Sequence, residues 1–142
     1  PQIPAVIICK LHSVLRTRHI YIWRINMIAI RGATTIENDT EEEVLSASKE
    51  LIEEIVKRNF LTEKDIISII TTCTKDIRAA YPGPGIRAAN IDVPILSMQE
   101  MDVEGSLKHC IRFIIHADIN AVPKHVYLKR AVGLRPDYKE DK

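Results

Sequence analysis

The chain has 142 residues, 46% of them hydrophobic, and its 20 Lys and Arg against 19 Asp and Glu give a formal net charge of +1. A chain of this length suits one domain with its own hydrophobic core. The three cysteines show neither a C-x-x-C pair nor a metal-ligand spacing, no apolar run approaches the roughly 18 residues of a membrane span, and no basic stripe carries interleaved aromatics. The sequence therefore predicts no metal site, no membrane segment and no nucleic-acid partner, and it favours a reduced, cytoplasmic setting.

Residues 1–26 differ in composition from the rest of the chain. They hold four basic residues and no acidic one, a charge of +4, whereas the remaining residues carry 16 basic and 19 acidic side chains, a charge of −3. Met27 stands at the junction. We interpret residues 1–26 as a non-family extension, upstream sequence translated ahead of the domain at 27–142. A transit peptide, which is also rich in Arg and poor in acids, is the alternative.

The first elements after Met27 are a strand and a long helix. "MIAIRG" (27–32) predicts a short strand ended by Gly32. In "NDTEEEVLSASKELIEEIVKRNF" (38–60), Thr40 and Glu43 form a capping-box pattern, acids occupy the first turn, and basic residues close the last turn. The helix has one broad apolar face for packing on a sheet, which includes Val44, Ser48, Leu51 and Ile55.

The rest of the chain alternates further strands with short irregular segments. The two prolines and two glycines of "AAYPGPGIRAAN" (79–90) predict a loop with at most a short helix near 86–90, and "GLRPDYKEDK" (133–142) predicts a coil or a short helical segment. Together these elements indicate a mixed α+β or α/β domain in which a mixed sheet packs with one long helix and one or two short ones. The four remaining predicted strands are "DIISIITT" (65–72), "VPILSM" (93–98), "HCIRFIIHA" (109–117) and "HVYLKRAV" (125–132).

Arg112 interrupts the apolar run 110–115, which otherwise reads as a buried strand. An unpaired buried guanidinium costs several kcal/mol, so this side chain is expected to face solvent, a partner or a cavity. Arg31, at the end of the first strand, is a second arginine that is expected to face solvent, a partner or a cavity. Glu100 and Tyr127 are further polar candidates in or beside predicted strands. On spacing alone these residues indicate an anion-binding domain.

Each candidate also has an ordinary structural explanation. Arg112 could lie in a solvent-exposed edge strand, Glu100 could pair with Lys108 at the surface, and Tyr127 could be a half-buried tyrosine whose hydroxyl reaches water. His109, His116 and His125 are interpreted as non-ligands, and Cys73 and Cys110 as small core residues. The sequence has no G-x-S-x-G, H-E-x-x-H or phosphate-loop motif.

Seven motifs in order give a more specific reading: "IRGATT", "DTEEE", "AAYP", "SMQEMDV", "CIR", "HVYL" and "AVGLRPD". From Ile28 to Asp137 the chain resembles the small monofunctional chorismate mutases of the AroH type. The resemblance implies a homotrimer of pseudo-barrel-like α/β subunits, with active sites in the clefts between neighbouring subunits. It also implies the rearrangement of chorismate to prephenate in phenylalanine and tyrosine biosynthesis, without cofactor or metal.

The resemblance implies roles for four catalytic residues. Arg112 would donate to the ether oxygen and to a substrate carboxylate, for which the planar guanidinium is suited. Arg31 and Tyr127 would bind a carboxylate. Glu100 would accept a hydrogen bond from the ring hydroxyl and help to balance the cluster of cations.

It also implies a set of substrate-binding residues around these four. Arg87 and Arg135 would attract and close over the dianion near the mouth, and Leu134 would line the wall. Pro84 occupies a position where relatives can carry lysine, and Ser97 occupies a position where relatives can carry cysteine. An inactive trimeric protein that binds a cyclic dicarboxylate is the alternative function, and a small hydrolase or deaminase of similar trimeric architecture is a weaker one. The residues expected from the neighbouring subunit are Tyr81, Gly83, Leu96 and Ser97.

Overall fold

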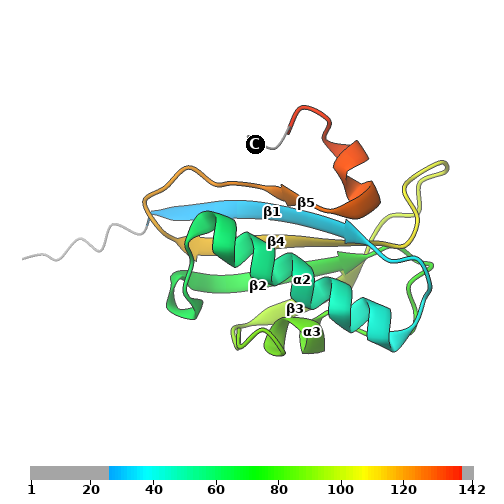
Figure 1. The fold of residues 1–142 in the computed structure, drawn as a ribbon, viewed down its shortest axis with the longest axis horizontal. Coiled ribbons are helices and arrows are strands. Elements are labelled where there is room, and N and C mark those ends of the chain that lie inside the picture. The colour runs from blue at the N-terminus through cyan, green and yellow to red at the C-terminus, as the bar shows by residue number, and fades with distance from the viewer. Residues whose placement is uncertain (1–25, 139–142) are drawn as a thin grey trace, which may run out of the picture.

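The computed structural model describes residues 26–138, so the interpretation of the N-terminal extension concerns residues that, apart from Asn26, lie outside the described part. The described chain forms one mixed α+β layer structure (Figure 1). None of the helices in residues 26–138 is long and apolar enough to cross a membrane. The elements are strands β1 (Met27–Thr35), β2 (Ile66–Cys73), β3 (Ile95–Gln99), β4 (Cys110–Asp118) and β5 (Val126–Tyr127), α-helices α2 (Glu41–Asn59) and α3 (Gly83–Arg87), and 3-10 helices η1 (Glu63–Asp65) and η2 (Lys129–Leu134).

The five strands form one sheet in the order β3-β2-β4-β1-β5. Strand β4 is antiparallel to both of its neighbours, whereas the outer pairs β2/β3 and β1/β5 are parallel. Parallel strands need a crossover connection, and α3 lies in the one between β2 and β3. Because β4 is central, Arg112 does not lie in an edge strand.

Helix α2 confirms the prediction from its apolar periodicity and its cap. The Thr40 hydroxyl accepts a hydrogen bond from the backbone N–H of Glu43 at 3.3 Å. The capping box is only half formed, because the Glu43 carboxylate accepts from the N–H groups of Glu37 and Asn38 instead of that of Thr40. Leu51, one of the predicted face, is fully buried.

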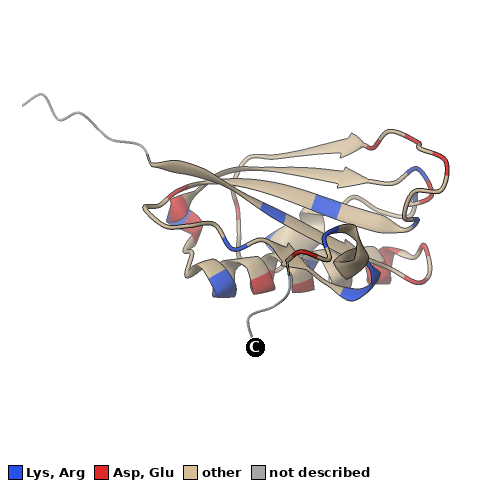
Figure 2. Cartoon of the chain, turned by 90° about the horizontal axis from the view of Figure 1, so that it is seen from above, with Lys and Arg blue, Asp and Glu red and all other residues tan. Residues whose placement is uncertain are grey.

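Both α-helices cover the same face of the sheet (Figures 1 and 2). Alternate residues of a strand point to opposite faces. In β4 the residues Ile111, Phe113 and Ile115 are buried in the core with α2, whereas Arg112 and Ile114 on the other face are only partly buried. We call this other side, which no α-helix of residues 26–138 covers, the open face.

Three predicted element boundaries are wrong. Strand β1 continues through Gly32 to Thr35, because Gly32 pairs with both neighbouring strands and its missing side chain makes room for Ile55. Helix α3 runs through the Pro-Gly segment instead of following it, since proline is tolerated in a first helical turn. Strand β5 ends at Tyr127, and Lys129, with φ of 51°, turns the chain into η2.

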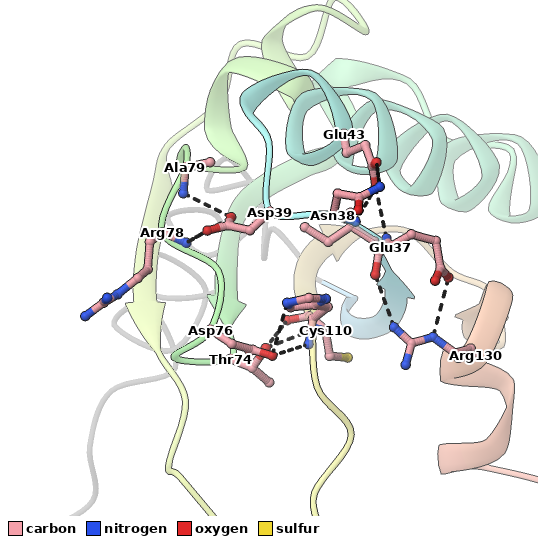
Figure 3. A network of polar contacts seen from close by, with 12 residues as sticks. Glu37, Asn38, Asp39, Glu43, Thr74, Asp76, Arg78, Ala79, Cys110 and Arg130 are labelled. Carbon is pink, nitrogen blue, oxygen red and sulfur yellow. Dashed lines mark hydrogen bonds and ion pairs between the residues drawn. The ribbon is translucent and has the colours of Figure 1, made fainter.

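A polar network ties the loops together at the end of the sheet where β1 ends and β4 begins (Figure 3). The Asp39 carboxylate accepts from the backbone N–H groups of Arg78 and Ala79 at 3.0–3.1 Å. The Asp76 carboxylate likewise accepts from the N–H of His109 at 2.8 Å. These contacts hold the start of α2 and the loop after β2 against the sheet.

Candidate active site

A cavity of about 360 Å³ lies on the open face. Its floor is made by strands β1, β2, β4 and β5, and its wall by the end of η2. Within the strands, Arg31 and Arg112 are the basic residues, and Figure 2 shows blue, basic positions inside the strands. The lining residues are Arg31, Gly32, Ala33, Ile70, Thr72, Arg112, Phe113, Ile114, Tyr127, Leu134 and Arg135.

Arg112 is held by a carboxylate at the cavity floor. Its Nη1 donates to Glu100 Oε2 at 2.7 Å, and the Glu100 side chain is only 11% exposed. The other Glu100 oxygen, Oε1, accepts a hydrogen bond from the Thr72 hydroxyl at 2.5 Å. The Nε of Arg112 is buried and has no hydrogen-bond partner. The surface pair of Glu100 with Lys108 is therefore wrong, and the arginine keeps a donor for another group.

Arg31 and Tyr127 reach the same cavity from β1 and β5. The Tyr127 hydroxyl is buried without a partner, although buried tyrosine hydroxyls usually have one. The backbone N–H of Arg31 donates to Nδ1 of His125 at 3.1 Å, so this ring nitrogen carries no proton. Burial, together with the charges of Arg31 and Arg135, lowers the pKa of His125. The cavity is thus electropositive.

Arg135 lines the cavity but is paired within its own segment. Its guanidinium forms two hydrogen bonds to Asp137, at 2.9 and 2.7 Å, and lies 4.4 Å from the ring centre of Tyr138. The bidentate pair raises the pKa of Arg135 and lowers that of Asp137 to about 2. Tyr138 in turn stacks on Tyr127, with ring centres 6.0 Å apart. Arg135 is therefore held at the rim of the cavity.

Six of the eleven predicted site residues are not among those that line this cavity. Glu100 meets it only through Arg112, and the five others lie away from it. Tyr81, 74% exposed, and Leu96, 58% exposed, turn their side chains outward. The Ser97 hydroxyl lies 2.8 Å from that of the fully buried Thr71, on the helix-covered face of the sheet. Gly83 and Arg87 belong to α3, where an added Cβ at Gly83 would lie 3.5 Å from the Arg87 guanidinium.

Three features of the cavity were missed from the sequence. Thr72 and His125 bind site residues through single long-range hydrogen bonds, which no local pattern reveals. Asp137, in contrast, lies two residues after Arg135, and this spacing could have indicated the pair.

Residues 26–138 also contain potential metal ligands and two cysteine thiols. Within residues 26–138, no group of three or more His, Cys, Asp or Glu side chains is placed to hold a metal ion. Burial raises the pKa of Cys73 to about 12 and also raises that of Cys110. Both are neutral thiols at physiological pH, which agrees with their interpretation as core residues.

The chain is similar to known proteins over most of its length. Residues 27–138 match the family model "Chorismate mutase type I". The chain is 43% identical over 114 residues to chorismate mutase AroH of Bacillus subtilis (strain 168), covering 76% of this chain and 89% of that protein. It is 36% identical over 113 residues to chorismate mutase AroH of Thermus thermophilus, covering 76% and 93%. A solved chorismate mutase from Clostridium thermocellum superposes with a TM-score of 0.72 at 42% identity, covering 73% of this chain and 96% of that one.

Proposed function

The chain belongs to the chorismate mutase type I family, isomerases that convert chorismate to prephenate for aromatic amino acid biosynthesis, and we propose that it binds this substrate in the cavity on its open face. The reaction is an intramolecular [3,3] rearrangement, in which a C–O bond breaks while a C–C bond forms. No proton has to be transferred and no covalent intermediate is needed. The protein has to hold a flexible dicarboxylate in a compact conformer and to stabilise negative charge on the ether oxygen.

Arg112 is the residue proposed to stabilise that charge. Its Nη1 is engaged with Glu100 and its Nε is buried without a hydrogen-bond partner, so the N–H groups of the guanidinium that Glu100 does not bind are the ones proposed to reach the ether oxygen. A donor held in place before the reaction costs no reorganisation in the transition state, which is why such groups contribute strongly to catalysis. Glu100 fixes the orientation of the guanidinium and, from the same position, accepts from the ring hydroxyl of the substrate.

The charge of the cavity suits a dianion. Three arginines, Arg31, Arg112 and Arg135, stand against the two carboxylates of Glu100 and Asp137. Arg31 and the unpartnered Tyr127 hydroxyl are proposed to bind one substrate carboxylate. Arg135 is proposed to bind the substrate at the rim of the cavity. Its pair with Asp137 would then either loosen or take the substrate as a third partner.

We propose that the remaining site residues come from a second copy of the chain in a homotrimer. The support is the open face, where Leu96 and Met98 are 58% and 53% exposed beside the partly buried Ile70 and Ile114. Exposed apolar patches of this kind mark interfaces. The five predicted site residues that this chain keeps away from its own cavity, Tyr81, Gly83, Arg87, Leu96 and Ser97, would then complete the cavity of a neighbour. Ser97 would contribute through its backbone, because its side chain faces the helices.

The single observation that carries this proposal is the Arg112–Glu100 pair at the floor of a cavity bordered by two further arginines. Purified protein should consume chorismate, followed by its ultraviolet absorbance, and produce prephenate. Arg112→Ala should lower turnover by a factor of about 10² to 10³. Unchanged turnover of a folded Arg112→Ala protein would refute the assigned role. Nothing in the described residues or the relatives favours the inactive binding protein.

The composite site has its own test. Light scattering should give the mass of a trimer. Mixing the inactive Arg112→Ala protein with an inactive Tyr81→Ala protein should restore part of the activity, because some sites then receive both intact residues. Absence of rescue in verified mixed trimers would place the whole site within one chain.

Two further proposals concern the chain outside the site. We propose residues 27–142 as the enzyme domain, since the family match starts at Met27, and the cytoplasm as its location. Protein lacking residues 1–26 should keep its trimeric mass and turnover. Loss of either would show that the extension belongs to the enzyme.

A further inference from the structure

We infer that Thr72 is a positioning residue for the reaction, one that orients the Glu100 carboxylate and through it the guanidinium of Arg112. This inference rests on the proposed function of the cavity. Its starting observation is that both oxygens of Glu100 are bound by the protein. Oε1 accepts from the Thr72 hydroxyl at 2.5 Å and Oε2 from Arg112 Nη1 at 2.7 Å.

The three side chains are fixed by neighbouring strands. Thr72 and Arg112 are directly opposite each other in the antiparallel pair of β2 and β4. Glu100 follows β3, and its backbone N–H donates to the carbonyl of Cys73 at 2.9 Å, which extends the β2/β3 pairing by one bond. The carboxylate is thus reached from both sides by groups whose backbones are locked in the sheet.

The hydroxyl of Thr72 restricts the rotation of the carboxylate. A carboxylate bound only by Arg112 is free to turn about its terminal bond, and the guanidinium would follow it. With Thr72 on the second oxygen, one orientation satisfies both hydrogen bonds. Threonine suits this task because its branched Cβ limits χ1. The plane of Arg112, and hence the direction of its unpartnered Nε, is set before substrate binds.

Thr72 also lines the cavity, so direct contact with substrate is the competing role. A hydroxyl has one proton to donate, and Thr72 gives it to Glu100. It therefore has no donor left for a substrate carboxylate. Its influence on the reaction is exerted through Glu100.

The test compares Thr72→Val, which removes the hydroxyl at nearly constant shape, with Thr72→Ser, which keeps it. We expect Thr72→Val to lower kcat about tenfold with a smaller change in KM, and Thr72→Ser to stay within about threefold of wild type. In a Glu100→Ala background, Thr72→Val should have no further effect, because residues that act as a unit are not additive. Thr34→Val is the matched control: its hydroxyl is buried without a partner, on the helix-covered face, and turnover should not change.

Each other outcome overturns the inference. It is wrong if folded Thr72→Val keeps the kcat of wild type, if Thr72→Ser is as slow as Thr72→Val, or if the effects of Thr72→Val and Glu100→Ala add. If thermal denaturation shows that neither Thr72→Val nor Thr72→Ala is folded, Thr72 is needed for the fold itself and the inference is also wrong. Inactive wild-type protein would refute the proposed function itself, whereas active wild type with an indifferent Thr72 refutes only this inference.

Discussion

Replacing Arg112 with lysine separates the charge of the arginine from its geometry. The guanidinium has five N–H donors, of which Nη1 serves Glu100 and the buried Nε serves no protein group. A lysine offers a single ammonium. Because the Glu100 side chain is only 11% exposed, that ammonium is expected to stay beside the carboxylate, where it neutralises the charge but cannot also reach the ether oxygen.

The expected loss is that of one preorganised donor, about 10²- to 10³-fold in kcat or about 3 to 4 kcal/mol. The fold should be nearly unaffected, since the buried carboxylate keeps a cation. Turnover is followed by loss of chorismate absorbance with prephenate identified as product, and stability by thermal unfolding. Arg130→Lys is the matched control, because Arg130 binds the Ile36 carbonyl and Glu37 outside the cavity. An Arg112→Lys protein that turns over within about threefold of wild type would refute the reasoning.

Four further predictions follow from the same contacts. Asp137→Asn should free Arg135 and lower KM for the dianion a few-fold, with the effect shrinking as salt is added. The pKa of His125 is lowered in the fold, so its contribution to the free energy of unfolding is complete above its ordinary value of 6.5 and is lost as pH falls below it, which urea titrations between pH 5 and 8 would show. Thr34→Val should raise the free energy of unfolding by about 1 kcal/mol, because it removes a buried hydroxyl without a partner. Gly85→Ala should lower it by about 2 kcal/mol, because a Cβ at this position would overlap the backbone of α2.

Each of these predictions has a control within the chain. Glu53→Gln, an acid removed from the exposed side of α2, should leave KM unchanged. His125→Asn keeps an acceptor and loses the titration, so its stability should vary less with pH. Thr71→Val should destabilise, since that hydroxyl is hydrogen-bonded to another. Gly133→Ala, where no atom lies near the added Cβ, should be neutral. A rise in KM for Asp137→Asn, or no difference between the members of a stability pair, would contradict the argument.

The sequence predicted best those elements whose signals are local. Helix α2 has its cap, its charges and its apolar period within its own residues, and the structure places it within a few residues of the expectation. Helix α3 was placed too late because its position depends on contact with α2, for which Gly85 is needed, and not on the loop propensity of its Pro-Gly segment. Strand β5 was predicted too long because Lys129 leaves the sheet in a conformation that the apolar pattern does not indicate.

For the candidate site, too, the sequence revealed local signals but not contacts between distant residues. The continuous apolar run 110–115 identified Arg112 as the residue out of place, and the motifs supplied the family. The partner of Arg112 could not be read from the chain, because Glu100 and Thr72 meet it only through the pairing of three strands. Nor did the sequence show that Leu96 and Ser97, although adjacent, turn their side chains to opposite faces of β3.

The division of β4 between two faces has a consequence for how the enzyme tolerates mutation. Ile111, Phe113 and Ile115 belong to the core with α2, whereas Arg112 and Ile114 lie on the open face and line the cavity, which Phe113 also borders. Neighbouring positions along this strand are therefore under different constraints. Substitutions at 111, 113 and 115 should affect stability, and substitutions at 112 and 114 should affect catalysis. A scan of all substitutions along this strand, scored separately for abundance and for growth without added phenylalanine and tyrosine, should give two profiles that alternate out of phase. The pleat of the sheet would thus let the active site change its specificity without weakening the core that holds it.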